Sequence, residues 1–321
     1  MRIWCNGDFG DEGMALLRDG TRAHELVLSS SLNTSVLAVG GRDPSFVGAD
    51  IAFGQPDPED CLANRGLRWI EVSSAGFTRY DTLAFKDALR ARRAAFTNAS
   101  QVYAEPCAEH VLAMMLALGR QLLPSYGAQL GDRGWHYNER RSKSCLLQGQ
   151  TVVMFGFGAI GRRVGELLAP FGMRVYALRR QLRSEPGVHV VSEESLTKVL
   201  SEADHVVNVL PENEETRNYV NARRISCFKP GARFYNVGRG MTVDQDALIE
   251  GLKSGRIGAA YLDVTVPEPL PPSHPLWSTP NCFITPHTAG GRSKGDVELV
   301  RHFLANLACF ENGTQMVDRI L

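Results

Sequence analysis

The sequence predicts an α/β protein built from more than one domain around parallel sheets, and three observations support this. Short apolar runs alternate with helical stretches along most of the chain, which is typical of repeated β-α-β units. The 321 residues exceed what a single hydrophobic core usually organises, so two domains are expected. A glycine-rich turn, Gly156 to Gly161, follows one apolar run and opens a helical stretch.

The first hundred residues contain four expected strands, each bounded by Gly, Pro or Asp. They are residues 3–5, 35–39, 50–53 and 67–72. Because strands that alternate with helices form parallel sheets, this part predicts a small α/β domain. Residues 104–123 then form one long helix that is apolar nearly all round, which indicates burial between domains or subunits. Residues 127–150 are polar and are expected to be an irregular connection.

From residue 151 onward the alternation is more regular. The expected strands are residues 151–155, 174–178, 205–210, 232–237, 259–264 and 283–285. The expected helices are residues 159–169, 192–201, 244–254 and 297–310. Ser192 is a candidate N-cap and Gly255 a candidate C-terminal stop. The last helix is expected to return to the first domain.

The composition is that of an ordinary globular protein, with 44% hydrophobic and 22% charged residues. Lys and Arg total 35, as do Asp and Glu, so no global field attracts nucleic acid or an anionic membrane. The seven scattered cysteines favour reduced thiols in a reducing compartment. The N-terminus lacks a signal-like stretch, and the longest apolar run, residues 111–118, is too short to span a bilayer. We therefore expect a cytoplasmic protein.

The glycine-rich turn has the setting that gives a dinucleotide site its mechanism, namely a strand before it and a helix after it. Gly156 permits the tight turn, Gly158 lets the backbone approach a pyrophosphate, and Gly161 lets the helix pack closely on the strand. The free N–H groups of Ala159 and Ile160, together with the helix dipole, favour the negative phosphate charge. The alternative interpretation is an ordinary strand-to-helix turn.

The end of the next strand indicates which dinucleotide binds. An NAD site normally has an Asp or Glu there, which binds the ribose 2′-hydroxyl. This chain has Arg179 and Arg180 instead, with no acid before Glu185. Because arginines bind a 2′-phosphate through charge-assisted bonds, we predict NADP(H) as the preferred cofactor and NAD(H) as the alternative. The alternative interpretation is that Arg179 and Arg180 belong to a solvated loop. Arg162 and Arg163 lie on the helix that follows the glycine turn, and we expect both to face solvent.

Three residues further along can bind and protonate a 2-oxo acid. Arg239 follows an expected strand, where open α/β sheets present ligand groups, and its guanidinium can hold a carboxylate and a carbonyl oxygen. His287, in a loop after a strand, can supply the proton. Glu268, if it reaches the imidazole, would favour the imidazolium and orient the ring. Taken singly, each of the three is equally explained as a solvated or capping side chain.

The wording, order and spacing of several segments are more specific than any single residue. These segments are Leu210-Pro211 with Thr216, Asn236-Val237-Gly238-Arg239-Gly240, Leu262-Asp263-Val264, Pro267-Glu268-Pro269-Leu270 and Thr285-Pro286-His287. Together they resemble the D-2-hydroxyacid dehydrogenase family. Arg179 in place of the usual Asp, with Asp263-Val264-Thr265, resembles its glyoxylate/hydroxypyruvate reductase branch. The resemblance is strong from about residue 67 to residue 290.

The resemblance implies two Rossmann-like domains with doubly wound parallel sheets, the cofactor domain being inserted in the substrate domain. Residues 1–100 and 291–321 would bind the substrate and residues 101–290 the dinucleotide. Arg239, Glu268 and His287 would be catalytic, with Arg239 also binding substrate. Asp263 would hold the nicotinamide carboxamide. The further cofactor contacts implied are Leu210, Pro211, Thr216, Val237, Gly238 and His287, and the implied substrate loop is Ser74, Ala75 and Gly76.

The leading hypothesis is therefore an oxidoreductase that transfers a hydride from NADPH to a small 2-oxo acid such as glyoxylate or hydroxypyruvate. The resemblance also implies a homodimer, and no pattern of residues indicates a metal site. Phe77 stands where the family commonly has Val, which leaves the substrate open. The alternative is a dinucleotide-sensing regulatory protein with little turnover, because the family includes corepressors that keep the same three residues.

Overall fold

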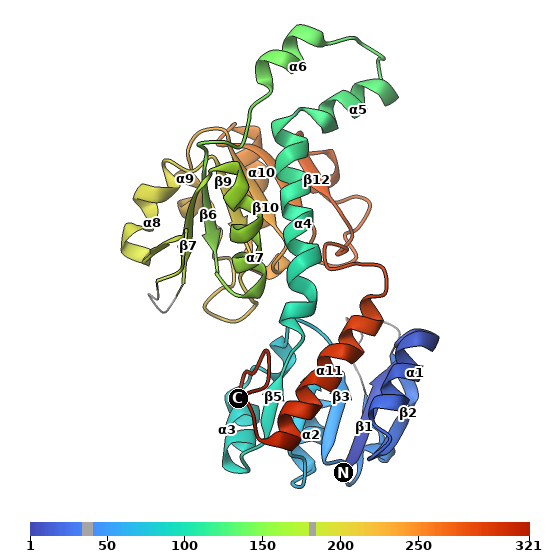
Figure 1. Ribbon diagram of the computed structural model, residues 1–321. Helices are drawn as coiled ribbons and strands as arrows, with labels where there is room; N and C mark the ends of the chain where they lie inside the picture. Colours follow the sequence, from blue (N-terminus) through green and yellow to red (C-terminus); the bar gives the residue numbers. More distant parts are fainter. Residues whose placement is uncertain (34–40, 180–183) are drawn as a thin grey trace. The chain divides into compact units, whose positions relative to one another are not determined.

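The computed structural model describes residues 1–33, 41–179 and 184–321, so the strand expected at 35–39 and the side chain of Arg180 lie outside the described residues. The chain forms two compact units (Figure 1). One comprises Met1–Tyr103 with Gly291–Leu321, and the other comprises Ala104–Gly290. Each unit is built on a parallel sheet flanked by helices, which confirms the predicted fold class.

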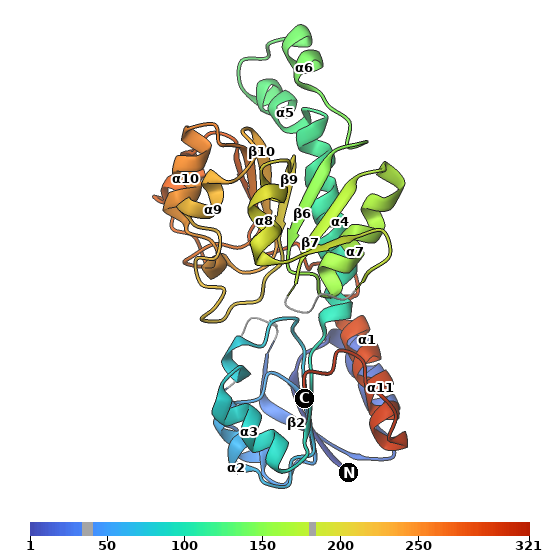
Figure 2. The ribbon, with the colours of Figure 1, turned by 90° about the vertical axis from the view of Figure 1, so that its left-hand side faces the viewer.

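The unit that contains both termini has a five-stranded sheet in the order β2-β1-β3-β4-β5, paired in parallel throughout. Its strands are β1 (Arg2–Gly7), β2 (Glu25–Asn33), β3 (Ile51–Gly54), β4 (Trp69–Val72) and β5 (Ala95–Thr97). Its helices are α1 (Gly10–Gly20), α2 (Pro58–Ala63), α3 (Leu83–Ala91) and α11 (Gly295–Asn312). The C-terminal helix α11 lies beside α1 in both ribbon views, so the chain closes this unit with its last element (Figures 1 and 2).

A stack of aromatic rings joins α11 to this sheet. The ring of Phe303 in α11 lies 4.2 Å from that of Phe53 in β3 and 5.2 Å from that of Trp69 in β4, both stacked. All three side chains are buried. Burial of side chains of this size contributes roughly 2–3 kcal/mol each, which explains why the last helix belongs to the first unit's core.

A buried ionic cluster lies next to these rings. His302 in α11 places Nδ1 3.0 Å from Glu71 in β4 and Nε2 3.2 Å from Asp318, while Asn306 donates to Glu71 at 2.8 Å. Burial lowers the pKa of His302, but the two carboxylates outweigh this effect and raise its pKa to about 9. His302 is therefore an imidazolium in the folded chain at neutral pH.

Replacing His302 with glutamine is expected to destabilise the protein by about 3 kcal/mol at pH 6, the free energy equivalent to raising this pKa from 6.5 to about 9. A histidine whose pKa is raised on folding stabilises the folded protein fully at pH values below its unfolded-state pKa. This stabilisation is lost as pH rises through the folded-state pKa. The difference from the wild type should therefore disappear between about pH 6.5 and pH 9. Urea unfolding of both proteins at pH 6 and pH 9.5 measures it. An equal loss at both pH values would show that packing, not charge, explains the effect.

The second unit has a seven-stranded parallel sheet in the order β12-β11-β10-β9-β6-β7-β8. Its strands are β6 (Thr151–Phe155), β7 (Arg174–Leu178), β8 (His189–Val191), β9 (His205–Asn208), β10 (Ala232–Asn236), β11 (Ile257–Leu262) and β12 (Cys282–Ile284). Its helices after β6 are α7 (Ala159–Leu168), α8 (Glu193–Leu200), α9 (Ala222–Ser226) and α10 (Gln245–Lys253). The strand order reverses at β6, so the crevice between the ends of β6 and β9 is the expected ligand position.

The segment before β6 differs from the sequence prediction. The long helix is α4 (Ser100–Gly119), which starts and ends earlier than expected. The connection predicted to be irregular contains α5 (Leu122–Leu130) and α6 (Tyr137–Lys143). These helices extend beyond the end of α4 and away from the seven-stranded sheet (Figures 1 and 2). In the described ranges no helix is both long and apolar enough for a membrane span.

Candidate active site

The glycine turn forms a cradle at the reversal point of the seven-stranded sheet. Gly156 has φ +92°, and a Cβ there would lie 3.3 Å from the carbonyl oxygen of Val209. A Cβ on Gly161 would lie 2.9 Å from the carbonyl oxygen of Gly156, so both positions need glycine. Gly158, the N-cap of α7, has open space within 4 Å of the Cβ position. A pyrophosphate can therefore approach the backbone there and meet the N-terminal N–H groups of α7.

The loops after the next two strands complete this edge of the sheet. Leu210 and Pro211 follow β9, and Val237 and Gly238 follow β10. A Cβ on Gly238 would lie 2.8 Å from the carbonyl oxygen of Leu210, so the two loops pack backbone against backbone. Thr216 donates its hydroxyl to the carbonyl oxygen of Pro211 at 2.7 Å. That side chain thus holds its own turn together, and its predicted contact with a cofactor stays a prediction.

The arginines near the cradle are held by carboxylates. Arg179, which directly follows β7, places Nη1 2.6 Å from Glu185 Oε1, and Arg162 in α7 lies 3.0 Å from the same oxygen. Arg163 forms ion pairs with Glu105 of α4 and with Glu166 of its own helix, α7. Arg162 is exposed as expected, with 46% of its side chain accessible, and Arg163 is partly exposed; each also forms an ion pair that the sequence did not indicate.

His287 and Glu268 meet at the end of β12. The imidazole Nδ1 of His287 lies 2.8 Å from Glu268 Oε2, and Glu268 Oε1 accepts the N–H of Thr265 at 2.9 Å. With Nδ1 committed to the carboxylate, Nε2 is the nitrogen that can exchange a proton with a ligand. His287 has φ +53°, a conformation rarely adopted by a side chain of this kind and frequently found at functional sites.

The carboxylate of Glu268 is stabilised in its ionised form. Burial raises the pKa of Glu268, but the hydrogen bond from His287, the N–H of Thr265 and the positive charge of Arg239 outweigh it. The net effect is a pKa below the ordinary glutamate value. Glu268 is therefore an anion beside His287 at neutral pH.

Arg239 lies at the end of a strand two places from β12 in the sheet, within electrostatic reach of Glu268. It follows β10 and precedes a short 3₁₀ turn, η4 (Gly240–Thr242). A Cβ on Gly240 would lie 2.1 Å from the carbonyl oxygen of Thr265, so the backbone of this turn packs directly on the segment that carries Glu268. The structure thus brings Arg239, Glu268 and His287 together within one unit, although they are far apart in the sequence.

Asp263 accepts hydrogen bonds from the loop that carries His287, a role that the sequence did not reveal. Its Oδ1 accepts the Thr285 hydroxyl at 2.5 Å and the Thr288 N–H at 2.8 Å, and its Oδ2 accepts the Ala289 N–H at 2.9 Å. Its carbonyl oxygen also accepts the His287 N–H at 2.8 Å. These four bonds hold the loop on both sides of His287, so Asp263 positions the imidazole. The predicted contact with a nicotinamide carboxamide would use the remaining acceptor capacity of Oδ2.

The predicted substrate loop, Ser74 to Gly76, begins two residues after the end of β4 in the other unit. The Ser74 hydroxyl donates to the carbonyl oxygen of Gly76 at 2.6 Å, and Asn98 donates to the carbonyl oxygen of Ala75 at 2.7 Å. The loop is therefore fixed by its own unit. Phe77 packs edge-on against Phe96 at 5.7 Å, so its partly buried ring packs against the core of that unit.

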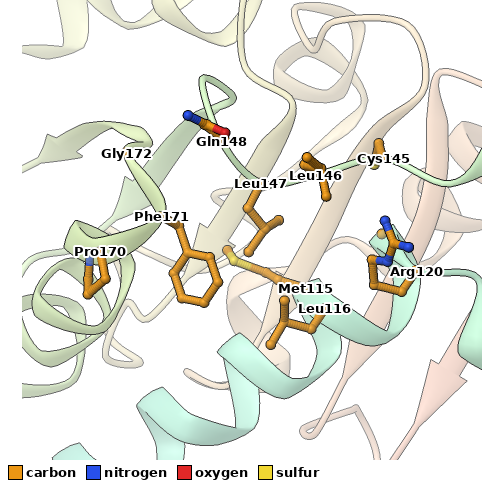
Figure 3. Close-up of a pocket in the computed structure, with 11 residues that line it drawn as sticks. Met115, Leu116, Arg120, Cys145, Leu146, Leu147, Gln148, Pro170, Phe171 and Gly172 are labelled. Atoms are coloured by element: carbon orange, nitrogen blue, oxygen red, sulfur yellow. The ribbon is translucent and has the colours of Figure 1, made fainter.

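A cavity of about 370 Å³ lies elsewhere in the second unit, between the end of α4, the segment before β6 and the turn after α7 (Figure 3). Its wall is largely apolar, with Met115, Leu147 and Phe171, and it contains none of the predicted site residues. Among residues 1–33, 41–179 and 184–321, no group of His, Cys, Asp or Glu side chains is arranged to hold a metal ion.

The chain is similar to known proteins over most of its length. Residues 112–289, more than half of the chain, match the family model described as D-isomer specific 2-hydroxyacid dehydrogenase, NAD binding domain. A glyoxylate reductase of Aeropyrum pernix is 33% identical over 227 residues, which is 68% of this chain and 66% of that protein.

Two solved structures extend the likeness to both units. A D-isomer specific 2-hydroxyacid dehydrogenase family protein of Aeromonas salmonicida is 28% identical, with a TM-score of 0.75 over 100% of this chain and 98% of that one. A D-isomer specific 2-hydroxyacid dehydrogenase of Xanthobacter autotrophicus, in complex with NADPH and MES, is 25% identical, with a TM-score of 0.82 over 100% and 98%. With the glycine cradle and the His287–Glu268 pair, these matches show that the chain belongs to the D-isomer specific 2-hydroxyacid dehydrogenase family, as a nicotinamide-dependent oxidoreductase.

Proposed function

We propose that this protein reduces a small 2-oxo acid of the glyoxylate or hydroxypyruvate type to the 2-hydroxy acid of the D series, with NADPH as the preferred hydride donor. The observation that carries the proposal is the 2.8 Å contact between His287 and Glu268, in the same unit as the glycine cradle. A proton donor held by an ionised carboxylate is what carbonyl reduction needs beside a nicotinamide site.

The residues divide the chemistry between them. When bound, the reduced nicotinamide supplies the hydride for the carbonyl carbon. The guanidinium of Arg239 binds the carboxylate and the carbonyl oxygen and stabilises the negative charge that develops on that oxygen. His287 donates the proton from Nε2 to the same oxygen, and Glu268 stabilises the imidazolium beforehand. Hydride and proton together convert the carbonyl to a hydroxyl, which balances the reaction.

Further contacts complete this proposal. The cofactor would be held by the glycine cradle with Ala159 and Ile160, by the β9 and β10 loops with Leu210, Pro211, Thr216, Val237 and Gly238, and by Asp263. The unit comprising Ala104–Gly290 is accordingly the dinucleotide-binding domain. The backbone N–H groups of the loop Ser74 to Gly76 are proposed to bind the substrate carboxylate.

The preference for NADPH is supported by Arg179 at the end of β7 and by the relative from Xanthobacter autotrophicus, which was solved with NADPH. Replacing Arg179 with aspartate is expected to lower kcat/KM with NADPH by about 10- to 100-fold, the loss of a charge-assisted bond to the 2′-phosphate, and to leave NADH use nearly unchanged. Steady-state kinetics with both cofactors measures this, with Arg22→Asp in the other unit as the control. Equal efficiency of the wild type with NADPH and NADH would contradict the preference.

A panel of 2-oxo acids with NADPH tests the activity itself. Glyoxylate and hydroxypyruvate are expected to be reduced, and larger 2-oxo acids in the panel measure the range of substrate sizes. The panel also separates the enzyme from the dinucleotide-sensing alternative. Tight NADPH binding without turnover on any 2-oxo acid would refute the proposed activity and favour the sensor.

We also propose a homodimer formed through α5, α6 and their flanking residues. Large apolar side chains are exposed along this segment, including Leu122, Tyr126, Leu130 and, at 92% exposure, Trp135. Such a concentration of exposed apolar surface is typical of an interface. Sedimentation velocity at micromolar concentration tests this, and a monomer would contradict it. The seven free thiols support the further proposal of a cytoplasmic location.

A further inference from the structure

We propose that Glu185 is an internal competitor for the 2′-phosphate of the cofactor, occupying Arg162 and Arg179 until that phosphate displaces it. This inference rests on the proposed preference for NADPH and concerns its regulation. The inference assigns to Glu185 a role in cofactor specificity. The sequence alone shows Glu185 only as the first acidic residue after Arg180.

The position of the two arginines supports the inference. The N–H of Gly156 donates to the carbonyl oxygen of Leu178 at 3.1 Å. Arg179 is the next residue in the chain, so its backbone lies beside the glycine turn. Arg162 lies one helical turn after Gly158, to whose carbonyl oxygen its N–H donates at 3.0 Å. Two elements of the cradle thus direct guanidinium groups to one point beside the proposed dinucleotide.

The same point is occupied by one carboxylate oxygen. Oε1 of Glu185 accepts from Arg179 at 2.6 Å and from Arg162 at 3.0 Å. The side chains of Glu185 and Arg179 are only 18% and 19% exposed, so this ion pair is largely shielded from water. Arg162 also lies over the ring of Phe157, 5.7 Å from its centroid. Arg179 is therefore held in place before any ligand arrives, and Arg162, with 46% of its side chain exposed, is held at the surface by its ion pair and by Phe157.

The charges of the two anions indicate which of them binds the arginines more strongly. Two guanidinium groups carry two positive charges, whereas Glu185 carries one negative charge. A phosphate monoester carries about −1.5 to −2 charges at neutral pH and three acceptor oxygens, so it matches the pair better. A ribose 2′-hydroxyl has no charge and cannot displace the carboxylate. Glu185 should therefore weaken NADPH binding and aid NADP⁺ release without excluding NADH.

The test is Glu185→Gln, measured by calorimetric titration with 2′-phospho-ADP-ribose and with ADP-ribose. Removing the competing charge should tighten binding of the phosphate probe by about tenfold, the effect of one charged hydrogen bond, and change ADP-ribose binding less than about twofold. Glu250→Gln, which removes an exposed ion pair with Lys253, is the matched control. In the double variant with Arg179→Ala most of the gain should vanish, because the competitor acts through Arg179.

Two results would overturn the inference. Unchanged or weaker binding of the phosphate probe by Glu185→Gln would mean that Glu185 merely positions the arginines. A gain that persists undiminished with Arg179→Ala would mean that its charge acts through bulk electrostatics. Failure of the proposed cofactor preference is seen separately, as equal binding of the two probes by the wild type. A selective gain in Glu185→Gln would support the competitor even then.

Discussion

Replacing His287 with glutamine is expected to lower kcat for 2-oxo acid reduction by about 10²- to 10⁴-fold, the usual contribution of a positioned general acid. Hydride transfer to the carbonyl carbon leaves negative charge on oxygen, and without the imidazolium only Arg239 remains to stabilise it. Binding of NADPH should change little, because His287 is one of many proposed cofactor contacts and the glycine cradle is built from other residues. Steady-state kinetics and NADPH titration on the same preparation separate the two effects.

His189→Gln is the control for this experiment, because His189 is an exposed histidine of β8 in the same unit. It should keep wild-type kcat. A His287→Gln variant that retains more than about a tenth of wild-type kcat would show that another group, or water, delivers the proton. Loss of NADPH binding in parallel with kcat would instead indicate a structural defect in the loop that Asp263 holds.

Replacing Glu268 with glutamine is expected to lower kcat/KM by about 10- to 100-fold and to remove the carboxylate whose protonation limits reduction at acid pH. Glutamine can still accept the N–H of Thr265, so the loop geometry is preserved while the negative charge beside His287 is removed. His287 then loses the anion that orients its ring and stabilises the proton that it donates. The profile of kcat/KM from about pH 4 to pH 10 compares the variant with the wild type.

The acid side of the same profile follows from the lowered pKa of Glu268. A carboxylate with a depressed pKa keeps its ion pair above that value and loses it only as pH falls through it. Wild-type reduction should therefore persist below pH 4.5, the ordinary glutamate value, if no other group titrates first. Superimposable profiles for wild type and Glu268→Gln would remove Glu268 from the role proposed for it.

Much of the second unit could be predicted because its central strands, such as β6 and β9, are buried along their whole length. The strands at 151–155 and 174–178 were expected with the bounds that the structure shows. A parallel strand covered by helices is a continuous apolar run with turn residues at its ends, so its limits are visible in the sequence. Gly255 likewise follows α10 with φ +73°, as its predicted stop. These signals are local, and a local signal does not depend on the rest of the chain.

Elements with weak local signals were missed. Edge strand β2 contains a run of serines, and β5 and β8 are three residues each, too short for a periodic pattern. The helix α8 starts after Ser192 as expected, but the hydroxyl lies 3.4 Å from that of Ser195 in place of a backbone N–H. Residues 137–143 are polar all round, so no apolar face indicated the helix α6.

The sequence by itself determined the fold class and the glycine turn, and it singled out Arg239, Glu268 and His287 as candidates, because each of these depends on residue types within one short segment. Only the tertiary structure decided that Asp263 holds the His287 loop, that Glu185 occupies Arg162 and Arg179, and that His302 is charged. These are contacts between side chains whose strengths depend on distance and burial. Sheet topology sets both quantities, and no run of neighbouring residues records them.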